Sequence, residues 1–172
     1  MHVVAETEWV SALAQAGISQ AHEHHRIGKG LQFGTIAKRT IVVHLGVPDT
    51  SFIERLFRSI LPLAKSWIVA PRYGDATSLG FGAFPDDIVA ISLSTSESDD
   101  IIRVICAPLN QGAGIDNDIY LLSVTGRVLI TWDHHTLREG FKIELTSIDD
   151  ASQLLVALNE LGAEMQAFYI DC

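Results

Sequence analysis

The stretch from residue 118 to residue 145 constrains the fold more than any other part of the chain. It holds three short runs rich in β-branched and aromatic residues, at 118–124, 127–133 and 141–145, and turn or polar residues separate them. Runs of this composition and spacing are typical of a three-stranded antiparallel meander. We therefore expect this meander to organise the sheet of the protein.

A two-residue loop at Thr125-Gly126 would fix which residues of the first two strands face each other. Counting outward from that loop defines two faces. One face pairs Val124 with Arg127, Leu122 with Leu129, Tyr120 with Thr131, and Asp118 with Asp133. The other face pairs Leu121 with Ile130 and Ile119 with Trp132, and it is expected to look into the core because it is apolar. A bulged three-residue connection would instead place Asp118 opposite Trp132.

Acidic and histidine residues gather at the open end of this meander. Like charges facing each other across a ladder are unfavourable by about 0.2 to 1 kcal/mol unless something neutralises them. Arg138 in the same loop, a divalent cation or a basic group on a partner could do so. The predicted binding residues at this end are Asp116, Asp118, Asp133, His134, His135 and Glu139.

The net charge of −9 is unevenly distributed along the chain. Residues 1–72 carry 5 acidic and 8 Lys or Arg residues, net +3, whereas residues 73–172 carry 16 acidic and 4 Lys or Arg residues, net −12. The acidic part repels phosphate backbones, which argues against nucleic-acid binding except through the N-terminal part. It is suited to attracting a basic protein, although such charge also serves solubility.

Length and composition predict one globular domain over residues 1–172. With 48% hydrophobic and 19% charged residues, the chain can bury a sizeable core and is not of the disordered type. The first residues lack the basic segment and apolar run of a secretory signal, and Lys65 interrupts the best apolar stretch. We therefore expect a cytoplasmic protein that does not enter membranes.

Three helices are expected outside the meander. The clearest follows the turn at 46–51, because Phe52, Leu56 and Ile60 form one i, i+4 row and Ile53, Phe57 and Leu61 form the next. It would connect two strands as a crossover. The others run from Thr7 to Ala16, with Trp9, Val10, Leu13 and Ala14 on one face, and from Ser147 or Asp149 to Leu161.

The remaining apolar runs are expected as strands at 31–36, 40–45, 66–70, 88–94, 101–107 and 164–170. The runs 88–94 and 101–107 would form a hairpin around the acidic turn 94–100. Segments 20–30 and 71–85 would be loops, the second with Phe81 and Phe84 packed on the core. Many strands with about three flanking helices, and no sustained βαβ alternation, indicate an α+β domain with a largely antiparallel or mixed sheet.

Familiar catalytic and cofactor motifs do not fit the chain. Gly80-Phe81-Gly82 lacks the third glycine of a dinucleotide fingerprint, and no Gly-x-Ser-x-Gly elbow occurs. Cys106 and Cys172 form neither a disulfide framework nor a metal motif, and Cys106 is expected in the core. Residues 133–135 match the Asp-His-His tripeptide of the DHH phosphoesterases, but the other acidic motifs of that family are missing.

Two functions from different classes are considered in detail, and a subunit or regulatory domain is a third possibility that the sequence leaves open. The first is a non-enzymatic protein-binding domain, similar in general character to small bacterial immunity proteins, which neutralise a toxin or effector by direct and partly electrostatic binding. It needs no cofactor, and its partner would have a basic surface. The alternative is a metal-dependent hydrolase in which Asp116, Asp118, Asp133, His134 and His135 hold the metal.

Overall fold

The structure is a computed structural model of the chain. It describes residues 1–15, 19–23, 31–34, 39–44, 50–71, 76–85, 87–111, 119–124, 128–132, 141–145, 148–162 and 164–169.

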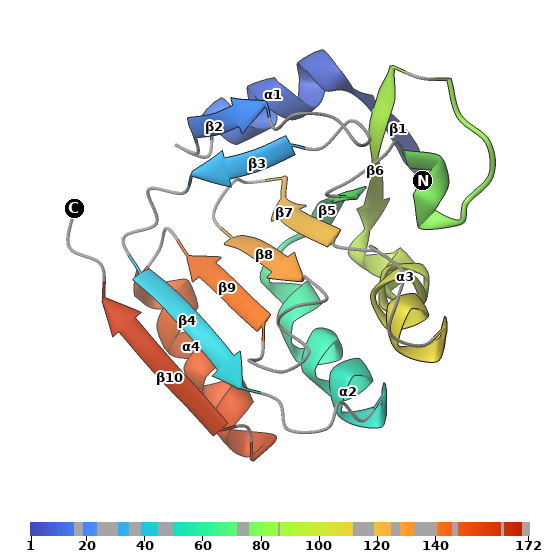
Figure 1. Cartoon of the computed structure of the whole chain (residues 1–172). Helices are drawn as coiled ribbons and strands as arrows, with labels where there is room; N and C mark the ends of the chain where they lie inside the picture. Colours follow the sequence, from blue (N-terminus) through green and yellow to red (C-terminus); the bar gives the residue numbers. More distant parts are fainter. Residues whose placement is uncertain are drawn as a thin grey trace.

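One eight-stranded sheet forms the centre of the described part, and every neighbouring pair of its strands is antiparallel. From one edge to the other it contains β1 (His2–Ala5), β6 (Ile88–Ser94), β5 (Ser66–Pro71), β7 (Ile119–Ser123), β8 (Val128–Trp132), β9 (Phe141–Leu145), β4 (Arg39–His44) and β10 (Glu164–Tyr169). Two further strands, β2 (Ser19–Glu23) and β3 (Leu31–Gly34), pair with each other (Figure 1). The predicted antiparallel α+β fold is confirmed.

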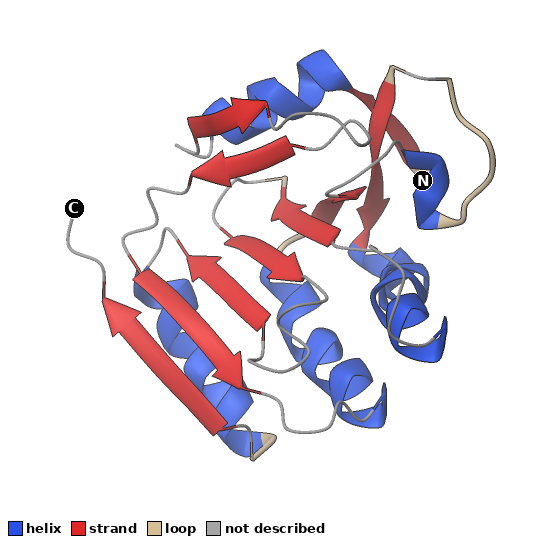
Figure 2. Cartoon of the chain, in the orientation of Figure 1, coloured by secondary structure: helices blue, strands red, loops and turns tan. Residues whose placement is uncertain are grey.

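Among the described residues, four α-helices lie against the sheet (Figure 2). They are α1 (Glu6–Gln15), α2 (Thr50–Ile60), α3 (Ser98–Gln111) and α4 (Ile148–Glu160). Buried residues of α2, α3 and α4 share the larger core cluster with one face of the sheet. Buried residues of α1 share a second cluster with the other face. The sheet is therefore the middle layer of three around β5, β6 and β7.

The central strand β7 is buried on both of its faces. Ile119 and Leu121 belong to the larger core, whereas Tyr120 and Leu122 belong to the cluster under α1. The prediction that the Leu121 face looks into the core is therefore confirmed, and the Tyr120 face, for which the sequence analysis made no such prediction, is buried as well. The run Ile-Tyr-Leu-Leu has no charged residue on either face, and this is typical of a strand that is covered on both sides.

Helix α1 begins directly after β1, a strand that the sequence analysis missed. The Glu8 carboxylate accepts a hydrogen bond from the Ala5 backbone N–H at 3.2 Å, which caps the first turn. Trp9 and Leu13 are fully buried, as predicted, because they face the sheet. Val10 and Ala14 were wrongly placed on that face, since both are exposed.

Helix α2 connects β4 to β5 across one face of the sheet, as the crossover prediction required. In the sheet, β4 is separated from β5 by β9, β8 and β7, and the four successive pairings are all antiparallel. Because four is an even number, β4 and β5 run in the same direction. Ile53 and Phe57 are fully buried, and so are Leu56 and Ile60, which confirms the two predicted rows. The Trp67 indole N–H then donates to the Leu61 carbonyl oxygen at 2.9 Å and fixes the end of the helix against β5.

Residues 101–107 lie within helix α3, so the predicted strand and its hairpin with β6 were wrong. The acidic segment after β6 is the beginning of that helix instead. Ser94 and Glu97 form a capping box, and Asp99 and Asp100 lie in the first turn of α3, where the helix dipole favours acids. Ile101, Ile102, Val104 and Ile105 are buried at helical spacing.

Most of the other predicted strands and helices are confirmed, and one predicted loop is not. Strands β3 to β6 and β10, and helix α4, lie where they were expected, and Gly162 ends α4 with a positive φ of 70°. Residues 20–23 belong to strand β2, so the prediction of a loop there was wrong, and residues 24–30 lie outside the described residues. Among the described residues, no helix combines the length and apolar character needed to span a bilayer.

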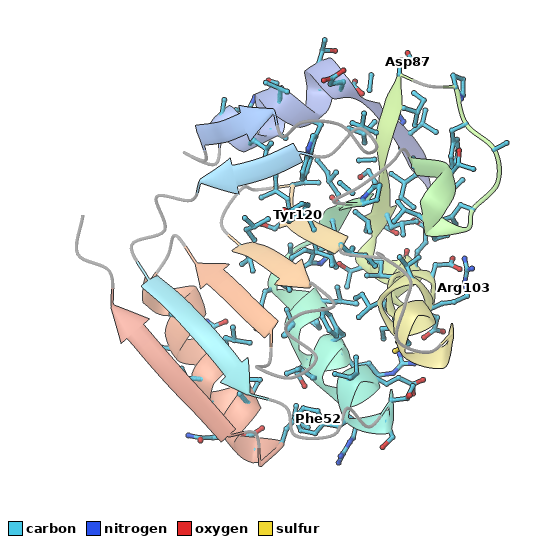
Figure 3. All side chains as sticks on the ribbon, viewed as in Figure 1. Phe52, Asp87, Arg103 and Tyr120 are labelled. Carbon is cyan, nitrogen blue, oxygen red and sulfur yellow. The ribbon has the colours of Figure 1, made fainter. Side chains whose placement is uncertain are left out.

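Phe81 and Phe84 pack against the larger core from the loop after β5, as predicted. The loop turns at Gly80 and Gly82, whose φ angles of 78° and 124° favour glycine. The Arg103 guanidinium lies 4.7 Å from the centroid of the Phe81 ring and 3.5 Å from the Asp100 carboxylate. Figure 3 shows Arg103 on the outer side of α3, where it connects this helix to the loop.

Burial on both faces of β7 can be tested by truncating one side chain on each face. We expect Leu121→Ala and Leu122→Ala each to lower the free energy of unfolding by about 2 to 5 kcal/mol, because both leave a cavity. Val124→Ala, at a side chain that is 52% exposed, should change it by less than about 0.5 kcal/mol. Urea denaturation measures all three. The three-layer arrangement would be contradicted if Leu122→Ala lowered the free energy of unfolding as little as Val124→Ala does.

The pKa of Glu97 provides a test of the cap before α3. The N-terminal ammonium, 2.7 Å from Oε1, is the largest cause that lowers this pKa from 4.5 to about 2, and the Ser94 backbone N–H adds to it. Because the folded-state pKa is depressed, the stabilisation is present above pH 4.5 and is lost as the pH falls toward 2. Carbon-detected NMR titration should show this pKa. Acetylation of the N-terminus should raise it, and an unchanged value would contradict the contact.

Candidate functional site

The register of β7 and β8 is the frame of the predicted site, and it agrees with the sequence analysis. Ile119 pairs with Trp132, Tyr120 with Thr131, Leu121 with Ile130 and Leu122 with Leu129. The alternative register, with Asp118 opposite Trp132, was wrong because Trp132 pairs with Ile119. Ile119 and Trp132 form the last described pair at this end of the two strands. Asp118 precedes Ile119 in the sequence, and Asp133 follows Trp132.

Side-chain and backbone hydrogen bonds hold the other end of this pair of strands. The buried Ser123 hydroxyl accepts a hydrogen bond from the Val128 backbone N–H at 3.0 Å. The Val124 N–H donates to the Ser66 carbonyl oxygen at 3.1 Å, which ties the same turn to β5. These contacts fix the register at the turn and so also fix which residues begin and end the ladder.

All six predicted binding residues lie outside the described residues. They are Asp116, Asp118, Asp133, His134, His135 and Glu139. Their predicted gathering at one end of the meander therefore stays a prediction. The candidate neutraliser Arg138 lies outside the described residues as well.

Strand β5 lies beside β7, and the sequence analysis did not predict this neighbour. Pro71 pairs with Ile119, which in turn pairs with Trp132. Arg72, itself outside the described residues, follows Pro71 in the sequence. In the sequence, Arg72, Asp118 and Asp133 are thus each next to a residue of this paired row. No local pattern signals this neighbour, because the pairing joins strands that are far apart in the chain.

The same end of the sheet continues to β6 and β1. Ala5 pairs with Ile88 there, and the Glu6 backbone N–H donates to the Asp87 carbonyl oxygen at 3.2 Å. The side chains of Glu6 and Asp87 are exposed, and Figure 3 shows Asp87 at the start of β6. Tyr120, in contrast, is buried and belongs to the cluster under α1. Exposed acids therefore also adjoin this end of the sheet outside the meander.

Within the described ranges, no group of three or more His, Cys, Asp or Glu residues is arranged to hold a metal ion. The residues of the hydrolase alternative lie outside these ranges, so that hypothesis is not tested by this finding.

Cys106 is buried in the larger core beside α2, as predicted. Burial raises the pKa of its thiol from 9.0 to about 11, and the negative charge of Glu54 adds to this increase. A thiol with a raised pKa carries little thiolate at neutral pH and is a poor nucleophile. Cys106 is therefore a packing residue.

No protein-family model matches the chain, and neither a curated protein nor a solved structure shows significant similarity to it.

Alkylation kinetics test the burial of Cys106. In a Cys172→Ser variant, iodoacetamide at pH 8 should leave Cys106 unmodified in the folded protein, because a thiol with a pKa of about 11 is about 0.1% thiolate there. Mass spectrometry should show complete modification in denaturant. Native-state modification at the rate of a free cysteine would contradict the assignment.

Proposed function

We propose that the protein is a non-enzymatic binding domain of the immunity type, which neutralises a toxin or effector by direct, partly electrostatic contact. Its binding residues are Asp116, Asp118, Asp133, His134, His135 and Glu139. The observation that carries this proposal is the pairing of Ile119 with Trp132. It supports the proposal because Asp118 and Asp133 are the sequence neighbours of these two paired residues.

Two carboxylates at the end of one ladder favour a basic ligand. Like charges on adjacent strands destabilise the protein by about 0.2 to 1 kcal/mol when nothing neutralises them. A cationic side chain of a partner removes that repulsion on binding, so part of the binding free energy comes from relief of an unfavourable contact. Arg72, the residue after Pro71 in the sequence, is a single positive charge against two acids.

The charge around this end supports a protein partner rather than a nucleic acid. The exposed Glu6 and Asp87 adjoin the same end of the sheet, and residues 73–172 carry net −12. A negative surface repels phosphates and speeds the encounter with a basic protein. Such association is fast and weakens as salt rises, because salt screens charges separated by more than about 10 Å at 0.1 M.

The test measures binding to the protein encoded by the neighbouring gene, the first candidate for a toxin or effector. Asp118→Asn/Asp133→Asn should raise the Kd about ten- to hundredfold at low salt, because close charge pairs across interfaces contribute a few kcal/mol. The variant should also show a weaker dependence of Kd on salt. Isothermal titration calorimetry at two salt concentrations provides both values.

Asp99→Asn/Asp100→Asn is the matched control. It removes the same number of charges from the first turn of α3, where both acids are described and exposed at least in part. If the two double variants raised the Kd by the same factor, net charge alone would drive binding, and the proposed site would be contradicted.

Metal analysis separates this proposal from the hydrolase. The protein, prepared in metal-free buffers, should hold no stoichiometric metal. A tightly bound metal that is lost in Asp133→Ala would instead favour the metal-dependent hydrolase, since a carboxylate is a common metal ligand.

A further inference from the structure

The two edges of the sheet differ in how open they are to another strand. At one edge, β1 has only four residues, its register with β6 shifts between Val4 and Ala5, and the chain enters α1 at the next residue. Short strands and bulges are devices that prevent edge-to-edge pairing. The β1 edge is therefore protected.

The β10 edge lacks these devices. Strand β10 makes six consecutive pairs with β4 without a register shift, and among the described residues it pairs with no other strand. Its sequence Glu-Met-Gln-Ala-Phe-Tyr has no proline or lysine, and its single charge is at the first residue, Glu164. Figure 1 shows β10 as the outermost strand of the sheet, with α4 behind it. A regular and largely uncharged edge is a template for strand pairing.

Every second residue of β10 directs its backbone N–H and C=O away from β4, because residues alternate in an antiparallel ladder. A partner strand must form hydrogen bonds to these groups through residues whose own backbone N–H and C=O also point away from their sheet. When the partner is a second copy of β10 in antiparallel orientation, this requirement allows a two-fold axis at Gln166 or at Ala167. Even-numbered residues of one copy then lie opposite even-numbered residues of the other, and odd-numbered residues lie opposite odd-numbered ones. Each face of one sheet therefore continues into the same face of the other.

Charge placement favours this antiparallel partner. With the axis at Gln166, Glu164 lies opposite Phe168 of the second copy, and with the axis at Ala167 it lies beyond Tyr169, the last residue of the described strand. Neither arrangement brings two like charges together, whereas an in-register parallel pair would place Glu164 against Glu164. An interface of this kind is isologous and closes after two copies.

We propose that the outer edge of β10, which pairs with no other described strand, binds a second copy of this chain, so that two sheets join across a two-fold axis at Gln166 or Ala167. This inference does not depend on the proposed function. Six residues of strand pairing bury less area than a standard stable interface, so the dimer should be weak, with a Kd on the order of micromolar.

The first test is the mass of the protein in solution. Sedimentation velocity between about 1 and 200 µM should show a shift from the 18.8 kDa chain toward twice that mass. Gln166→Lys should raise the dimer Kd at least about tenfold, since a charge blocks an edge. Val3→Lys adds the same charge to a 38% exposed position on the β1 edge and should leave the Kd unchanged. Circular dichroism confirms that both variants fold.

Self-crosslinking locates the axis. In a Cys172→Ser background, Gln166→Cys or Ala167→Cys should form a disulfide-linked dimer under mild oxidation, because only a residue on the axis lies within about 4.4 to 6.8 Å of its own copy. Val3→Cys is the control and should not crosslink to the same extent.

A single 18.8 kDa species at every concentration would overturn the proposal. So would a dimer that responds to Val3→Lys but not to Gln166→Lys, or one in which neither axis position crosslinks. If the β10 amides become protected from hydrogen exchange only in a complex with another protein, the edge binds a foreign strand, and the proposal is again wrong.

Discussion

The structure depends on the burial of β7 between two apolar layers. It pairs with β5 on one side and with β8 on the other. Its buried side chains belong to the same core cluster as those of α2, α3 and α4 on one face, and to the same cluster as those of α1 on the other face. Full burial of a Leu or Ile side chain contributes about 1.5 to 3 kcal/mol, and β7 contributes to both layers. The position of α1 therefore depends on the same strand as the positions of the three helices on the opposite side. Burial of the strand leaves only its ends for contact with other molecules.

Much of this fold could be predicted from local pattern, and the errors have physical causes. The meander register followed from counting outward from Thr125-Gly126, and the rows of α2 followed from helical spacing. Residues 101–107 were misassigned because a short apolar run fits a strand and a buried helix face equally well. The capping box of Ser94 and Glu97 and the acids after it would have identified the helix. Strand β1 has four residues without a turn signal before α1, so periodicity could not reveal it.

The candidate site was less predictable than the fold because it depends on neighbours that are distant in the chain. The sequence could place Asp118 and Asp133 at the ends of adjoining strands, and the observed pairing of Ile119 with Trp132 agrees with that count. It could not show that Pro71 pairs with Ile119, so Arg72 did not enter the prediction. The described acids near helix starts have structural roles. Glu8 caps α1, Glu97 caps the short 3-10 helix Thr95–Glu97 before α3, and Asp99 pairs with Arg58 at 2.8 Å. Part of the negative charge along the chain thus serves helix caps and ion pairs.

Strand β4 lies between β9 and β10, although it precedes both by most of the chain. Its sequence neighbours α2 and β5 are completed early in synthesis, but β4 has no partner in the sheet until β9 has left the ribosome. Such non-local pairing slows folding, because the chain must close a long loop before any contact stabilises it. During translation the segment Arg39–His44, whose middle residues Ile41, Val42 and Val43 are apolar, therefore has its first partner strand only once residues 141–145 have been made. Nascent chains of this protein are expected to need protection of that segment until the last third of the chain emerges.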